Sequence, residues 1–113
     1  LGTPYQPVFK DCIVVLEDIG EAPYRIDRML TQMKMAGCFN GVAGLVIGSF
    51  LKCGPPTELS ALFKACFKDL RIPVAAGFSV GHYGRNLTVP LGISARFSAV
   101  KGELIYLESA TRD

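Results

Sequence analysis

Two side chains capable of acid–base chemistry each follow an apolar segment. Glu17 comes directly after the apolar run 12–16, and His82, the only histidine, follows the apolar segment 72–76 by a short turn. If both segments are parallel strands, the two residues lie at one carboxyl edge, where open α/β sheets place their sites. A carboxylate there fixes the imidazole tautomer and stabilises the imidazolium of a general base. We therefore predict a catalytic pair. The alternative is that Glu17 interacts with a helix N-terminus and His82 is a polar turn residue.

Other polar residues near these positions offer competing interpretations. Asp18 is the rival carboxylate, but alternation along a strand points it away from Glu17. Residues 77–81 match the nucleophile pattern G-x-S-x-G around Ser79. That pattern needs a helix directly after the serine, whereas a β-rich segment follows here, so we do not expect Ser79 to be a nucleophile. Arginine clamps carboxylates well, and surface ion pairs are the alternative role. The candidates for such a clamp are Arg25, Arg28 and Arg96.

The elements that must position this pair follow from the apolar pattern. The unbroken apolar run 12–16 predicts a strand covered on both faces, 41–47 a second buried strand and 72–76 a third strand. One amphipathic helix begins near Pro23, and another follows the break at 54–57. The order β-α-β-α-β indicates parallel strands with right-handed crossovers. The apolar helix positions are Ile26, Met29, Leu30 and Met33, and then Leu59, Leu62, Phe63, Cys66, Phe67 and Leu70.

The pattern changes after His82. Segments 86–91, 93–100 and 103–108 are predicted as strands, with a hairpin turn at 101–102. Segment 93–100 alternates apolar and polar residues, which is typical of an antiparallel strand with one wet face. We therefore expect an α/β fold class, with a small parallel β/α sheet and an added antiparallel β layer.

Composition limits the classes of function. At 113 residues and a net charge of +2, the chain predicts one packed domain without the basic stripe of a nucleic-acid binder. Its apolar runs are far shorter than the ~20 residues of a membrane span. No leader or initiator Met is present, so we expect part of a longer polypeptide. No Cys-x-x-Cys pair occurs, and we predict no metal, reduced thiols and a cytoplasmic location. The cysteines are Cys12, Cys38, Cys53 and Cys66.

Four segments together resemble one enzyme family. The string LEDIGEAPYRIDRML at 16–30 closely resembles a signature of the LD-carboxypeptidases, also called muramoyltetrapeptide carboxypeptidases. Residues 1–5, the segment GVAGLVIG at 41–48, and GFSVGH at 77–82 with Asn86, Pro90, Leu91 and Gly92 beyond it fit the same pattern in the same order. The resemblance covers essentially the whole chain. The microcin C immunity peptidase is a relative of the same family.

The resemblance implies a Ser-His-Glu triad without metal or cofactor. It places the Glu at Glu17 and the His at His82, and it assigns the serine to an N-terminal domain outside residues 1–113. It implies that 1–113 form the C-terminal domain, a swivelling β/β/α fold. Members of the family are cytoplasmic, often homodimeric, and remove the terminal D-alanine from murein tetrapeptide in peptidoglycan recycling. The segment alone is then expected to be inactive.

Two further interpretations remain open. A microcin immunity-type serine peptidase would keep the same triad and cleave a peptidyl-nucleotide antibiotic; the string at 16–30 favours the murein substrate. A non-catalytic binding or dimerisation module of the same fold predicts that Glu17 and His82 are not near each other.

Overall fold

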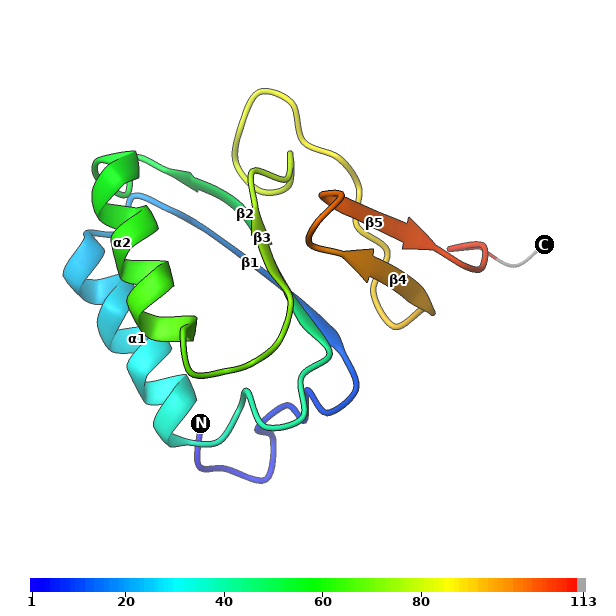
Figure 1. Ribbon diagram of the computed structural model, residues 1–113, viewed down its shortest axis with the longest axis horizontal. Coiled ribbons are helices and arrows are strands. Elements are labelled where there is room, and N and C mark those ends of the chain that lie inside the picture. Colours follow the sequence, from blue (N-terminus) through cyan, green and yellow to red (C-terminus); the bar gives the residue numbers. More distant parts are fainter. Residues whose placement is uncertain (112–113) are drawn as a thin grey trace.

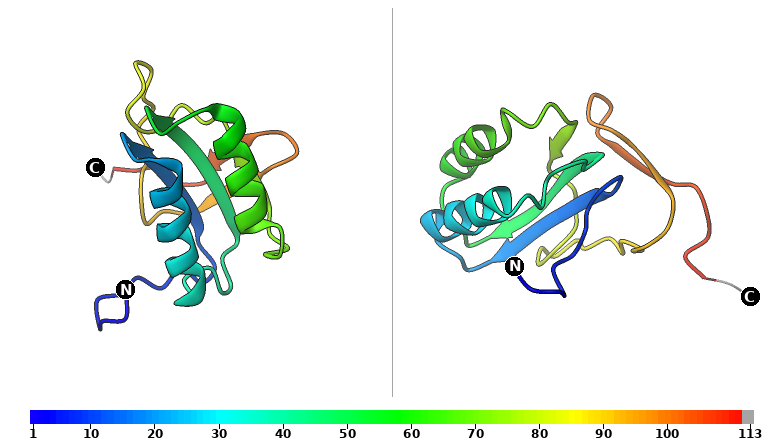
Figure 2. Two further views of the ribbon diagram at one scale, coloured as in Figure 1. Left: turned by 90° about the vertical axis from the view of Figure 1, so that its left-hand side faces the viewer. Right: turned by 90° about the horizontal axis from the view of Figure 1, so that it is seen from below.

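The computed structural model describes residues 1–111, and the predicted β-α-β-α-β order is confirmed (Figure 1). Its elements are β1 (Ile13–Ile19), α1 (Pro23–Met35), β2 (Gly44–Leu51), α2 (Pro56–Phe67), β3 (Val74–Ala76), β4 (Ala95–Ser98) and β5 (Glu103–Tyr106). Both helices cover one face of the sheet, and the β4–β5 hairpin lies on the other side (Figure 2). The fold is therefore the expected α/β class, in three layers.

The central sheet has the strand order β1-β2-β3, and all three strands are parallel. Strand β2 lies in the middle, with Leu45 opposite Val14 on one side and Val74 on the other. Leu45 and Val46 are completely buried, because helices cover one face of β2 and the hairpin approaches the other. The carboxyl ends of β1, β2 and β3 consequently share one edge.

The helices pack a narrow apolar stripe onto this sheet. Each has a proline at its first turn, where the missing N–H is not needed. Ile26 and Leu30 of α1 are buried, but Met29 is 41% exposed, so the predicted stripe was one residue too wide. In α2, Phe63 lies between the rings of Phe50 and Phe67, with centroid distances of 4.9 and 6.2 Å. The aromatic rings thus lock α2 to the core.

The antiparallel layer forms as predicted for one hairpin only. β4 pairs with β5 in the register Arg96↔Ile105, and the turn contains Gly102 at φ +65°. Phe97 lies over the sheet at Gly44, where a Cβ would be 2.6 Å from the ring. The glycine therefore lets the hairpin approach the central strand.

Several predicted boundaries were wrong. No strand forms over 86–91, and the chain from Gly77 to Ser94 is an irregular loop. Strand β1 continues past residue 16 to Ile19 instead of ending there, and Cys12 is exposed just before it. Strand β2 begins at Gly44, because residue 41 adopts φ +74° in a turn. Apolar composition alone does not determine pairing, which needs a partner strand at the right distance.

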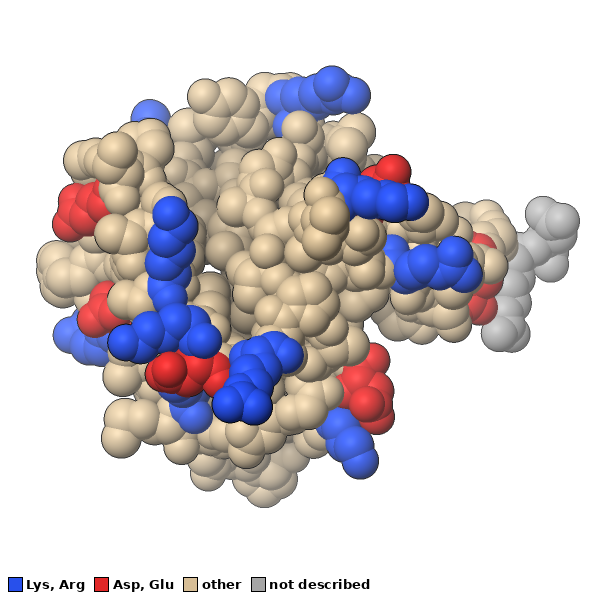
Figure 3. Space-filling view, viewed as in Figure 1, with Lys and Arg blue, Asp and Glu red and all other residues tan. Residues whose placement is uncertain are grey.

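The surface of the described residues is mixed in charge. In the view of Figure 3, Lys and Arg side chains are scattered over the helices and the hairpin, with acidic side chains among them. No helix within residues 1–111 is long and apolar enough to cross a membrane.

Candidate functional site

Glu17 lies where the pairing of β1 with β2 shifts in register. Leu16 pairs with Ile47 and Asp18 pairs with Phe50, so two residues of β2, Gly48 and Ser49, lie opposite Glu17 alone. Such a β-bulge bends the strand and redirects side chains, and bulges recur beside active sites. It lies near the carboxyl end of the sheet, on the side where the loop after β3 returns.

His82 is carried by that loop, which hydrogen bonds hold against β2. The N–H of Ser49 donates to the carbonyl of Val80 at 2.7 Å, and the N–H of His82 donates to Ser49 Oγ at 3.0 Å. Gly81 has φ +115°, and a Cβ there would overlap Ser49 Oγ and lie 2.7 Å from Glu17 Oε2. A glycine is therefore required at this position for the loop to come so close to the strand.

The structure brings Glu17 and His82 into direct contact. His82 Nδ1 lies 2.7 Å from Glu17 Oε2, although 65 positions separate the residues. An ionised carboxylate can only accept, so Nδ1 is the donor, and in the neutral imidazole the lone pair is then on Nε2. The side chain of His82 is 50% exposed and that of Glu17 is 34% exposed. No described residue forms a hydrogen bond with Nε2. The arrangement presents an oriented imidazole base at an open surface.

The competing residues are placed elsewhere. Asp18 Oδ1 accepts the N–H of Ile19 at 2.8 Å, a local contact that leaves Glu17 as the partner of His82. Ser79 is followed by an irregular loop instead of a helix, so the nucleophile elbow is not built. Hydrogen bonds to Tyr24 and Glu21 raise the pKa of Arg25, whose Nη1 lies 3.3 Å from Glu21. Arg25 thus forms the surface ion pair that was the alternative to a substrate clamp.

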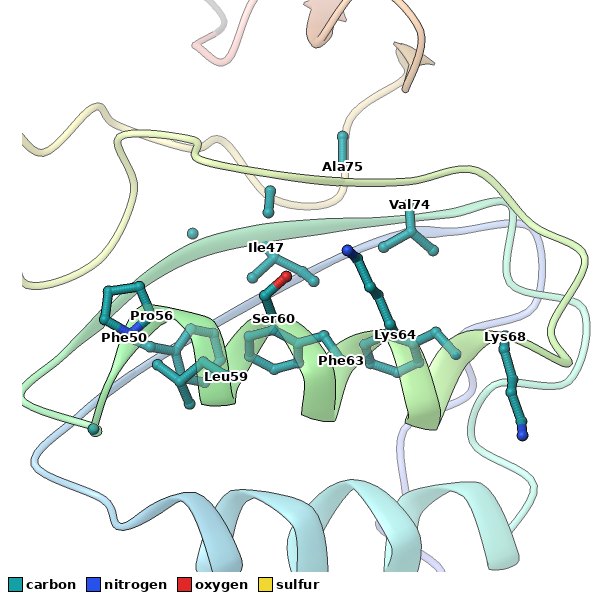
Figure 4. A pocket seen from close by; sticks show the side chains of 14 residues that line it. Ile47, Phe50, Pro56, Leu59, Ser60, Phe63, Lys64, Lys68, Val74 and Ala75 are labelled. Atoms are coloured by element: carbon teal, nitrogen blue, oxygen red, sulfur yellow. The ribbon is translucent and has the colours of Figure 1, made fainter.

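Glu17 and His82 lie outside the groove beside α2. An apolar groove of about 690 Å³ lies between α2 and the strands β2 and β3, lined by Phe63 and Val74 among others (Figure 4). Ser60 and Lys64 point from α2 into that groove, and Glu17 and His82 are not part of it. Within residues 1–111, no three His, Cys, Asp or Glu side chains are placed to hold a metal ion.

Sequence reasoning missed the roles of two residues at the site. Ser49 is one small residue in an apolar strand, and its role follows only from the β-bulge. Asn86 Oδ1 accepts the N–H of Gly81 at 3.0 Å; the sequence pointed to Asn86 through its place in the family pattern, but not to this contact.

The fold and the site define an α/β domain with a carboxylate–imidazole pair at a sheet edge, and comparison names its family. The sequence profile of the LD-carboxypeptidase C-terminal domain matches residues 1–97. The chain belongs to this family. It is 38% identical over 112 residues to a Synechocystis protein provisionally named a carboxypeptidase, covering 95% of this chain and 37% of that protein. It is 35% identical over 106 residues to a Bacillus subtilis protein named a probable murein peptide carboxypeptidase, covering 89% and 33%.

Solved structures with a similar fold include a member of the same family. Muramoyltetrapeptide carboxypeptidase from Oxalobacter formigenes superposes with a TM-score of 0.78 and 31% identity, over 93% of this chain and 39% of that one. The microcin C7 self-immunity protein superposes with a TM-score of 0.82 over 98% and 34%; its identity of 21% shows a shared fold alone. The chain spans about a third of the length of the curated relatives it matches.

Proposed function

We propose that residues 1–113 are the C-terminal domain of a serine-type LD-carboxypeptidase, in which Glu17 and His82 are two members of the catalytic triad. The observation that carries the proposal is the 2.7 Å contact between His82 Nδ1 and Glu17 Oε2. The third member, a serine, belongs to an N-terminal domain of the same polypeptide, and the segment alone is inactive. The open surface around His82 Nε2 supports this, because a nucleophile from another domain has access to it.

In the proposed reaction, His82 moves the proton and Glu17 holds the ring. Nε2 takes the hydroxyl proton as the serine oxygen bonds to the carbonyl carbon between an L-centre and D-alanine. The tetrahedral intermediate collapses, the C–N bond breaks, and Nε2 returns the proton to the leaving amine of D-alanine. Water then attacks the ester carbonyl carbon as Nε2 takes a proton from it, and Nε2 gives that proton to the serine oxygen as the ester C–O bond breaks. Glu17 keeps the proton on Nδ1 throughout and stabilises the imidazolium.

The substrate assignment to murein tetrapeptide rests on the relatives. Besides the Bacillus protein, a Pseudomonas aeruginosa protein named murein tetrapeptide carboxypeptidase is 30% identical over 87 residues. A role in peptidoglycan recycling, a cytoplasmic location and a homodimer belong to the same proposal.

Two other functions make different predictions. A non-catalytic module has no need for the contact between Glu17 and His82, which therefore supports catalysis. A microcin immunity-type peptidase would use the same pair on a peptidyl-nucleotide. The higher identity to the murein enzymes, 31% against 21%, favours the murein substrate.

The test measures D-alanine release from murein tetrapeptide by the complete polypeptide, wild type beside His82→Ala and Ser79→Ala. We expect wild-type release, a loss of several orders of magnitude in His82→Ala, and near-wild-type activity in Ser79→Ala. Full activity in His82→Ala would contradict the site, and loss in Ser79→Ala would restore the elbow. A folded wild type that cleaves only a peptidyl-nucleotide would favour the microcin-type function.

A further inference from the structure

Ser49 binds the loop of His82 through both its backbone and its side chain. Its N–H donates to the Val80 carbonyl at 2.7 Å, and its Oγ accepts the N–H of His82 at 3.0 Å. These two bonds grip the chain on either side of Gly81. The β-bulge places Ser49 opposite Glu17. The residue that binds the loop therefore lies beside the carboxylate that His82 contacts.

Asn86 holds the preceding amide of the same loop. Its Oδ1 accepts the N–H of Gly81 at 3.0 Å, and the N–H of Leu87 donates to the carbonyl of Ser79 at 2.7 Å, which closes the loop at its base. Two consecutive amides, those of Gly81 and His82, are therefore each bound by a side-chain oxygen from a different segment.

We propose that Ser49 and Asn86 are positioning residues, which hold the backbone of His82 so that Nδ1 meets Glu17. No helix or strand constrains residues 77–94, and the His82 side chain is half exposed, so packing alone does not orient it. Each neutral hydrogen bond favours the held conformation by roughly two- to tenfold. The effect of these two hydrogen bonds on catalysis rests on the proposed function, whereas their effect on the orientation of His82 does not.

The test uses the fact that His82 is the only histidine. In the 113-residue chain labelled with ¹⁵N-histidine, the ring nitrogen resonances report the Nδ1–H tautomer without ambiguity. The variants are Ser49→Ala, which removes the acceptor, and Ser49→Thr, which keeps it. Asn86→Leu and Asn86→Asp form the same pair for the other amide. Ser60→Ala, in the distant groove on α2, is the matched control.

We expect the ratio of the Nδ1–H tautomer to the other neutral tautomer to fall roughly two- to tenfold in Ser49→Ala and Asn86→Leu. It should return to the wild-type value in Ser49→Thr and Asn86→Asp. Backbone amide spectra outside the loop show that each variant is folded. A ratio in Ser49→Ala and Asn86→Leu equal to that of Ser60→Ala overturns the proposal.

The same variants in the complete polypeptide separate this inference from the proposed function. Ser49→Ala should lower kcat for D-alanine release in proportion to the fraction of His82 that remains in the Nδ1–H tautomer, and it should leave KM unchanged. If the wild type releases no D-alanine while the tautomer ratios shift as expected, the proposed function fails and the positioning role stands. If activity is normal and the ratios do not shift, the positioning role fails alone.

Discussion

Replacing Glu17 by Gln separates the catalytic contact from the stability of the domain. The amide of Gln has nearly the shape of the carboxylate, so the backbone and the bulge at 48–49 are preserved. At 2.7 Å from His82 Nδ1, however, the amide can present an N–H and leave the ring proton on Nε2. An imidazole with its proton on Nε2 cannot accept one from a serine hydroxyl there.

The expected magnitudes differ strongly for the two observables. In a triad, an amide in place of the carboxylate lowers kcat by about 10⁴-fold, or about 5 kcal/mol of transition-state stabilisation. The side chain of Glu17 is 34% exposed and that of His82 is 50% exposed, so solvent screens the pair in the folded state. The free energy of unfolding should therefore change by less than about 1 kcal/mol in Glu17→Gln.

The assay is D-alanine release by the complete polypeptide, with urea unfolding of the same preparation. Asp18→Asn is the matched control, because Asn can still accept the N–H of Ile19 that Asp18 Oδ1 accepts now. Its activity should stay within about twofold of wild type. If Glu17→Gln keeps activity within tenfold of wild type, or if Asp18→Asn loses as much, the tautomer argument is refuted.

Three further outcomes follow from packing and ionisation. Phe63→Ala should lower the free energy of unfolding by about 3–5 kcal/mol in urea titration, because its ring fills the core beneath α2. The Glu108 carboxylate accepts the N–H of Ser94, which lowers the pKa of Glu108 below 4.5. This contact therefore contributes stability above pH 4.5 that is lost as the pH falls through the lowered pKa, and Glu108→Gln should abolish the pH dependence of the Ser94 amide shift. Burial raises the pKa of Cys66, so iodoacetamide at neutral pH should modify exposed Cys12 well before Cys66, as peptide mass mapping would show.

Local patterns were sufficient for the architecture of the first half of the chain. Continuous apolar runs and helical spacing predicted the parallel sheet and its two helices, because a strand buried on both faces is apolar at nearly every position. The same reasoning placed Glu17 and His82 at one edge of the sheet. It failed at 86–91, where apolar residues lie in an irregular loop, and at Met29, which faces solvent.

The sequence by itself therefore determined the order of the parallel strands and their two helices, the family and the two polar residues that share an edge. Only the tertiary structure decided that they touch. That contact depends on one extra residue of β2 opposite Glu17, on the positive φ of Gly81, and on the grip of Ser49 and Asn86 on the loop. The bulge and the bond from His82 to Ser49 join segments distant in the chain, and a register shift or a loop approach leaves no periodic pattern in the residues that make it.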